Sequence, residues 1–180
     1  MRLTLTRHGE TIENTLGIHQ GQTVPGTLSS KGVAEAEELA EQLKNERFSA
    51  IFVSPLNRVK ETADIVLRHH QYVSAIEEHA LKPKDSKAYD GKPRELIYED
   101  SKRLGVPVAL IKTKDGESIA DLQARTARFL ERLKSEGYEN VLLIAHGDVI
   151  ATMLLAIHDK HMDSSPEFVP KPSETVVVEI

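Results

Sequence analysis

Arg7, His8 and Gly9 directly follow a short apolar segment at the start of the chain, and all three residue types suit the handling of a phosphate group. A guanidinium group presents a planar fork of donors that matches phosphate oxygens, and a neutral imidazole beside it can act as a nucleophile. Glycine lets the backbone approach a ligand closely. Because ligand sites in α/β proteins lie where strands end, this segment predicts phosphoryl transfer through a phosphohistidine. The alternative is a structural histidine, with Arg7 paired to Glu10.

A second histidine-glycine step, His146-Gly147, ends the most apolar segment of the chain, residues 141–145. Such a continuous apolar run is typical of a strand buried in a parallel sheet. The carboxyl ends of parallel strands meet at one edge, so both histidine-glycine steps are expected there. The two steps therefore predict one shared site.

Arg58 follows the short apolar segment 50–53 and is expected in the first turn of a helix. A cation is unfavourable at that position because the helix macrodipole is positive there. A bound phosphate would compensate, since helix N-termini bind anions. We therefore predict that Arg58 belongs to the same site; a surface ion pair with Glu61 is the alternative.

Composition limits the class of protein. The 180-residue chain is 39% hydrophobic and 28% charged, as in soluble globular proteins, and its length fits one domain over residues 1–180. A net charge of −5 without a basic run argues against a nucleic-acid partner. There is no cysteine and no apolar segment long enough to span a membrane. We expect a cytoplasmic monomer or homodimer without a membrane partner.

Strand and helix patterns alternate along the chain, which indicates an α/β layered fold. The expected strands are residues 2–7, 50–53, 72–76, 141–145 and 175–180, and the expected helices are 31–46, 55–69, 94–104, 118–135 and 148–158. Ser118 and Asp121 form a capping-box pattern at the start of one helix. Residues 80–93 are the least regular stretch and predict a polar loop near the site.

Four segments resemble, in order and spacing, the motifs of the histidine phosphatase (phosphoglycerate mutase-like) superfamily. They are Arg7-His8-Gly9-Glu10-Thr11 with Asn14, Ser54-x-Leu56-x-Arg58-x-x-x-Thr62-Ala63, Gly116-Glu117-Ser118 and Ala145-His146-Gly147. The resemblance covers nearly the whole chain. Residues 20–29 are also similar to the corresponding loop of the TIGAR type of fructose-bisphosphate phosphatase, within the TIGAR-like or broad-specificity branch.

The resemblance implies a three-layer α/β/α sandwich with a mostly parallel sheet. It also implies a phosphomonoesterase that acts on small phosphorylated metabolites, such as sugar phosphates, without metal or cofactor. The catalytic residues would be His8, which attacks phosphorus, and Arg7, Arg58 and His146, which hold the phosphate oxygens. The substrate-binding residues would be Asn14, Gln20, Gly21 and Gly147. The two guanidinium charges would keep His8 unprotonated.

The sequence departs from the family pattern at the general acid. The glutamate usual after the third strand is Pro83 here, and proline cannot donate a proton. Asp85, two residues on, is the predicted acid, with Asp148 as the second candidate and Glu78 or Asp90 as weaker ones. A positioned acid contributes about 10²–10⁴-fold. We therefore expect aryl phosphates, which leave without protonation, to be preferred over alkyl or sugar phosphates.

Three alternatives stay open. One is a mutase of the same family, and another is a non-catalytic phosphometabolite binder in which Pro83 marks lost chemistry. The third is a metallohydrolase that uses His8, His146 and Asp148, although the adjacent arginines would repel a cation. The remaining histidines are predicted to be ordinary surface residues: His19, His69, His70, His79, His158 and His161.

Overall fold

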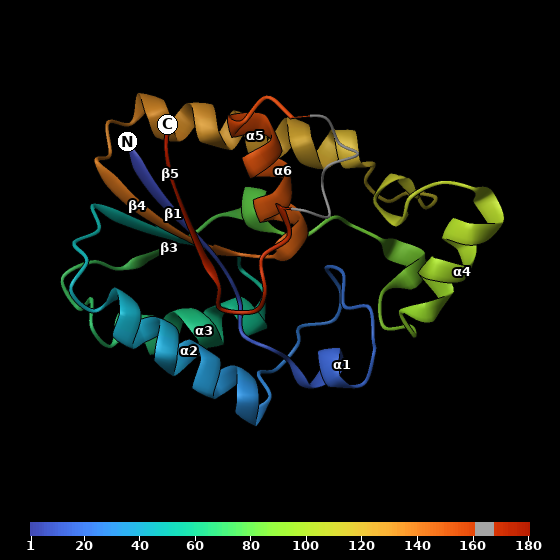
Figure 1. The fold of residues 1–180 in the computed structure, drawn as a ribbon, viewed down its shortest axis with the longest axis horizontal. Coiled ribbons are helices and arrows are strands. Elements are labelled where there is room, and N and C mark those ends of the chain that lie inside the picture. The colour runs from blue at the N-terminus through green and yellow to red at the C-terminus, as the bar shows by residue number, and fades with distance from the viewer. Residues whose placement is uncertain (161–167) are drawn as a thin grey trace.

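A computed structural model describes residues 1–160 and 168–180, and its centre is a five-stranded sheet (Figure 1). The strands are β1 (Arg2–Arg7), β2 (Ala50–Val53), β3 (Ala75–Glu77), β4 (Asn140–Ala145) and β5 (Thr175–Glu179), in the order β3-β2-β4-β1-β5. β1 through β4 pair in parallel, and β5 pairs antiparallel to β1 at the edge. The expected mostly parallel sheet is confirmed.

Helices cover both faces of the sheet, which gives the three-layer sandwich that was expected. α2 (Ser30–Leu43) and α3 (Asn57–Leu67) lie on one face, and α5 (Ile119–Ser135) and α6 (Gly147–Ile157) lie on the other (Figure 1). α1 (Ile12–Thr15) and α4 (Glu95–Leu104) lie to one side of the sandwich (Figure 1). The connecting segments include the single 3₁₀ turns η1 (His79–Leu81), which contacts α5, η2 (Lys87–Tyr89) and η3 (Val108–Leu110).

β4 has a continuous apolar sequence because both of its faces are buried. Leu143 and Ala145 belong to the core cluster beneath α5 and α6, whereas Leu142 and Ile144 belong to the cluster beneath α2 and α3. The side chains alternate between the two faces, as the pleat of a strand requires. Burial on both sides holds β4 rigidly in the middle of the sheet, and β4 in turn positions whatever follows it.

The pairing of β1 with β4 brings two distant parts of the chain to one sheet edge. The register aligns Arg7 with Ala145, and the His8 backbone N–H continues the ladder by donating to the Ala145 carbonyl at 3.1 Å. His8 and His146 therefore leave the sheet side by side. The predicted meeting of the two histidine-glycine steps follows from this register.

Local signals set the helix starts close to their predicted positions. Ser118 and Asp121 form the expected capping box before α5, and the Ser29 side chain accepts from the Gly32 N–H at the start of α2. Gly9 and Gly32 allow this end of α2 to pack on the segment after β1. A Cβ on Gly9 would lie 2.5 Å from the Gly32 carbonyl oxygen, so a side chain there would push the two backbones apart.

Several sequence predictions need correction in detail. β3 begins at Ala75 rather than at residue 72, and the four-residue α1 was not predicted. The expected loop at 80–93 includes the end of η1 and the whole of η2, so its backbone is more ordered than its composition indicates. Within the described residues, none of the helices combines the length and the apolar character needed to cross a bilayer.

Candidate active site

His8 and His146 form the centre of the candidate site. Both side chains are buried, and their ring centroids lie 5.2 Å apart at an interplanar angle of 66°. They border a cavity of about 910 Å³ that also reaches Arg7 and Arg58. All four residues that were predicted to share a phosphate site therefore line one cavity.

The hydrogen bonding of His8 fixes which ring nitrogen can attack a substrate. Its Nδ1 lies 2.8 Å from the Gly9 carbonyl oxygen, and because a carbonyl only accepts, Nδ1 carries the proton. The lone pair is then on Nε2. Burial, followed by the charges of Arg58 and Arg7, lowers the pKa of His8 from 6.5 to about 3. The imidazole is neutral at physiological pH, which is the state a nucleophile needs.

Arg58 is buried and ties the adjacent loop to the site. Its Nη1 donates to the carbonyl oxygens of Val24 and Pro25 at 2.9 and 3.2 Å, and its Nη2 donates to the Gly21 carbonyl at 3.0 Å. Burial is the main cause that lowers the pKa of Arg58 to about 10, so it remains a cation at neutral pH. The guanidinium group both organises this loop and places a positive charge beside the two imidazoles.

His146 is held between two partners. Arg58 Nη2 lies 3.2 Å from Nδ1, and since a guanidinium only donates, Nδ1 is the acceptor. The ring proton is then on Nε2, which donates to Ser54 Oγ at 2.9 Å. Burial and the nearby Arg58 charge lower the pKa of His146 well below 6.5. In this arrangement His146 orients Arg58 rather than offering a free donor.

Two guanidinium donors point to an anion site. The Nε atoms of Arg7 and Arg58 are buried without a hydrogen-bond partner among the described residues, and Arg7 Nη1 donates to the Pro170 carbonyl at 3.1 Å. Buried donors of this kind are costly unless they are paired. A tetrahedral oxyanion in the cavity would supply acceptors for both.

The surface ion pairs that were considered for these arginines do not form. The Glu10 carboxylate instead accepts from Ser29 Oγ and Lys31 Nζ, at 2.8 and 3.1 Å. The Glu61 carboxylate accepts from the Leu28 backbone N–H and from Asn57 Nδ2, at 2.7 and 2.8 Å. Arg7 and Arg58 are therefore available to the cavity.

The four predicted substrate-binding residues also line the cavity. Gly147 is the first residue of α6, so its backbone N–H belongs to the first turn of that helix. Asn14 Oδ1 accepts from the Thr11 N–H, and Gln20 Nε2 donates to Thr11 Oγ1 at 2.7 Å. The Gly21 carbonyl accepts from Arg58, as described above. Asn14 and Gln20 therefore already have partners inside the protein that would compete with a ligand.

An apolar wall closes the other side of the cavity. It is formed by the side chains of Ile18, Ile97, Tyr98, Val108, Leu110 and Ile119. Four of these six residues belong to α4 and η3, two elements in which no sequence motif indicates a function. The cavity thus pairs a cationic end with an apolar end.

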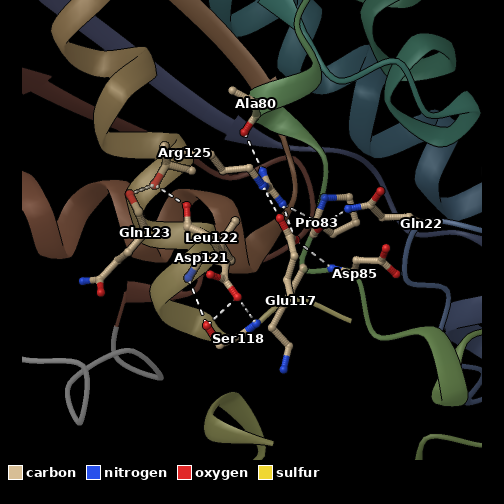
Figure 2. Close-up of polar contacts among 12 residues, drawn as sticks. Gln22, Ala80, Pro83, Asp85, Glu117, Ser118, Asp121, Leu122, Gln123 and Arg125 are labelled. Atoms are coloured by element: carbon tan, nitrogen blue, oxygen red, sulfur yellow. Dashed lines mark hydrogen bonds and ion pairs between the residues drawn. The ribbon is translucent and has the colours of Figure 1, made fainter. Parts of the chain in front are cut away.

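An ion pair fixes the loop that carries Pro83 (Figure 2). Arg125 Nη1 and Nη2 donate to the carbonyls of Ala80 and Pro83, at 2.7 and 2.9 Å, while Arg125 Nε pairs with Glu117 at 2.8 Å. Glu117 also accepts from the Asp85 backbone N–H at 2.9 Å. This explains the Gly116-Glu117-Ser118 motif as an anchor for the loop: Glu117 holds it, while Ser118 caps α5.

Asp85 does not reach the cavity, contrary to the prediction that it is the general acid. Its carboxylate accepts from the Lys87 backbone N–H at 3.3 Å and pairs with Lys87 Nζ at 2.9 Å, and Asp85 is absent from the cavity wall. The Asp85 backbone N–H donates to Glu117, which holds this part of the loop against the start of α5 (Figure 2). Pro83, two residues earlier, does line the cavity.

The other predicted acids are also engaged. Asp148 lines the cavity, but its Oδ2 accepts from the Lys84 N–H at 2.7 Å and its Oδ1 from the Val149 N–H at 2.9 Å. Glu78 is paired with Arg132 and accepts from the Ala80 N–H. Every oxygen of these two carboxylates therefore already has one partner among the described residues.

The prediction that the other histidines are surface residues is wrong for two of them. His70 is fully buried, and His19 lines the cavity with a side chain that is 26% exposed. His69, His79 and His158 are exposed as predicted, and His161 lies outside the described residues. Arg94 and Lys84 also line the cavity and were missed, since nothing in their local sequence distinguishes them from other loop cations.

Histidine, cysteine, aspartate and glutamate side chains do not converge in threes anywhere in residues 1–160 and 168–180 closely enough to hold a metal ion. The set that the metallohydrolase alternative requires, His8, His146 and Asp148, lies beside Arg7 and Arg58, whose charges oppose a cation.

Comparison with known proteins shows the family of this chain. Residues 3–180 match the profile of the histidine phosphatase superfamily (branch 1), so this chain belongs to that superfamily. The adenosylcobalamin/alpha-ribazole phosphatase of Salmonella typhimurium is 29% identical over 164 residues, which are 86% of this chain and 78% of that protein. Fructose-2,6-bisphosphatase TIGAR B of Danio rerio is 29% identical over 153 residues, 83% of this chain and 58% of that protein.

The structural comparison leads to the same class. The crystal structure of the alpha-ribazole phosphatase from Shigella flexneri aligns with a TM-score of 0.84 at 25% identity, over 100% of this chain and 91% of that chain. The fold is phosphoglycerate mutase-like. Family membership and these phosphatase relatives identify this protein as a phosphatase.

Proposed function

We propose that this protein is a metal-independent phosphomonoesterase that hydrolyses small phosphorylated metabolites through a phosphohistidine on His8. The observation that supports this most strongly is the neutral His8 in one cavity with Arg7 and Arg58, whose buried Nε donors have no hydrogen-bond partner among the described residues. Fixed cationic donors stabilise the charge of a transferring phosphoryl group, which is the part that Mg²⁺ plays in other phosphotransferases.

The proposed reaction has two displacements at phosphorus. His8 Nε2 attacks in line, the bond between phosphorus and the ester oxygen breaks, and the alcohol leaves with a proton. Water then attacks the phosphohistidine, releases inorganic phosphate and restores His8. Arg7 and Arg58 would hold the equatorial oxygens. A donor role of His146 toward phosphate requires a proton on Nδ1, so substrate would have to replace its bond with Arg58.

The apolar wall bears on the choice of substrate. A cavity of about 910 Å³ is at the large end for a small-molecule site, and a bare phosphate would fill little of it. Contact with Ile97 and Tyr98 favours monoesters whose alcohol carries an apolar or aromatic group. Aryl phosphates are therefore expected to be turned over faster than sugar phosphates, both for their leaving group and for this contact.

A phosphatase panel with the wild type and His8→Ala tests the proposal. His8→Ala is expected to lower hydrolysis by at least about 1,000-fold, whereas His79→Ala, at an exposed histidine outside the cavity, is the matched control. Rapid quenching in alkaline detergent with ³²P-labelled substrate should label the wild type and not His8→Ala. Equal labelling or equal activity of the two proteins would overturn the proposal.

The same reagents separate the alternatives. Incubation with 3-phosphoglycerate should release inorganic phosphate, whereas a mutase would yield the 2-phospho isomer. A non-catalytic binder would show phosphate binding without any labelled protein.

We also propose a cytoplasmic location, a monomeric or homodimeric state and no nucleic-acid or membrane partner, on the basis of composition and charge.

A further inference from the structure

The proposed reaction lacks an obvious proton donor. An alkoxide is a poor leaving group, so turnover of alkyl or sugar phosphates needs an acid near the ester oxygen. Pro83 has no proton to give, Asp85 faces Lys87, and both oxygens of Asp148 accept backbone N–H groups. The inference that follows rests on the proposed function and concerns the same cavity.

His19 is a titratable side chain of the cavity that the proposed mechanism does not use. Its side chain is 26% exposed, and it is placed by two backbone bonds across the cavity rim: the His19 N–H donates to the Lys92 carbonyl at 2.9 Å, and the Gly91 N–H donates to the His19 carbonyl at 2.8 Å. These two bonds fix the backbone from which the imidazole reaches the cavity.

A buried carboxylate, that of Asp90, lies near this imidazole. His19 Nε2 lies 4.0 Å from Asp90 Oδ1, and each of these atoms is buried without a hydrogen-bond partner among the described residues. The Asp90 side chain is 2% exposed, and its Oδ2 accepts from the N–H groups of Gln22 and Thr23, both at 3.2 Å. The carboxylate is thus fixed, with one oxygen left toward the imidazole.

Gly21 makes room for this pair. A Cβ at Gly21 would lie 1.8 Å from Asp90 Oδ1, so any side chain there would displace the carboxylate. Gly21 also has a φ of +51°, which glycine adopts without strain. Its carbonyl accepts from Arg58, so the loop that carries His19 is anchored directly to the phosphate site.

We propose that His19 is the general acid for the leaving group and that Asp90 is its positioning residue. Nε2 of His19 faces Asp90, and Nδ1, which is not buried and has no hydrogen bond among the described residues, serves the cavity. His19 Nδ1–H gives its proton to the ester oxygen as the bond to phosphorus breaks and His8 Nε2 bonds phosphorus. The neutral His19 then takes a proton from the attacking water, which restores both histidines and releases phosphate.

The charges around His19 set the pH range of this step. Burial is the largest cause and lowers the pKa of His19; the charges of Arg94 and Lys84 lower it further, while Asp90 and Asp148 oppose this. The acid form is therefore lost as pH rises through a value below 6.5 in the free protein, and a bound phosphate dianion extends it upward. Turnover of alkyl phosphates should fall over this range as pH rises.

His19→Gln tests the proposal with two substrates that differ in leaving group. Hydrolysis of an alkyl phosphate such as glycerol 1-phosphate should fall by about 100-fold or more, while p-nitrophenyl phosphate, which leaves without a proton, should change by less than about threefold. Asp90→Asn should show the same selective loss to a smaller degree. His79→Gln, at an exposed histidine outside the cavity, is the matched control.

The outcomes separate this inference from the proposed function. If His8→Ala abolishes both activities but His19→Gln lowers both equally or neither, the phosphatase proposal stands and the role of His19 is wrong. If His8→Ala keeps both activities, the proposed function itself fails. The pH profile of the wild type is a second test that does not depend on the folding of any variant. With rising pH, kcat for the alkyl ester should decline, whereas kcat for the aryl ester should not. Parallel profiles would overturn the assignment of His19 as the acid.

Discussion

Replacing His8 with asparagine is expected to remove a large part of the acid sensitivity of the fold. The pKa of His8 is about 3 in the folded protein and 6.5 in the absence of burial and neighbouring charges. Between pH 6.5 and pH 3 the unfolded chain binds a proton at His8 that the folded protein does not bind. The contribution of neutral His8 to the unfolding free energy is therefore fully present above pH 6.5 and is lost as pH falls toward 3.

The size of the effect follows from the same two values. Their full difference corresponds to about 5 kcal/mol of unfolding free energy, and the part lost between pH 7 and pH 5 is about 2 kcal/mol. His8 is 4% exposed, so solvent screening reduces this little. His8→Asn keeps an N–H near the Gly9 carbonyl but does not titrate, and should lack this 2 kcal/mol loss.

The assay is urea unfolding at pH 7 and pH 5, followed by far-ultraviolet circular dichroism because the chain has no tryptophan. The wild type should lose about 2 kcal/mol more than His8→Asn between the two pH values. His79→Asn, at an exposed histidine, should behave like the wild type. Losses that agree within about 0.5 kcal/mol in wild type and His8→Asn would refute the claim that burial and Arg7 and Arg58 hold this imidazole neutral.

Three further predictions concern the cations and the loop anchor. Arg58→Lys should lower kcat/KM for p-nitrophenyl phosphate by about 100-fold or more, because an ammonium group cannot span three carbonyls and an imidazole. Inorganic phosphate at 100 times its Kd should raise the unfolding free energy by about 2.7 kcal/mol in the wild type, and this gain should largely disappear in Arg58→Lys. Glu117→Gln breaks the pair with Arg125 that anchors the loop at Pro83, and should raise KM several-fold while lowering the unfolding free energy by about 1–2 kcal/mol, as measured by steady-state kinetics and urea unfolding.

Local patterns in the sequence were sufficient for the sheet and for the phosphate end of the site. β2 and the capping box of α5 were placed correctly because apolar runs and caps act over a few neighbouring residues. Parallel pairing then brings strand ends together, so His8 and His146 could be predicted to meet. Arg58 was identified from a broken local rule, a cation in the first turn of α3.

The leaving-group end of the cavity could not be predicted in this way. Asp85 is close to Pro83 in sequence, but its carboxylate pairs with Lys87, and its backbone is held by Glu117, 32 residues further along the chain. His19 was taken for a surface residue because its neighbours in sequence are polar. In the fold its Nε2 lies 4.0 Å from Asp90, which belongs to another loop.

The sequence by itself thus determined the family and the four side chains that meet at the cationic end of the cavity, since each lies in a short contiguous motif. Only the tertiary structure decided which loop residues share the cavity. Loops have no periodicity that fixes the direction of a side chain, so contacts such as that of Arg125 with Ala80, 45 residues apart, decide it instead. The proposed acid, His19, belongs to this second kind of information.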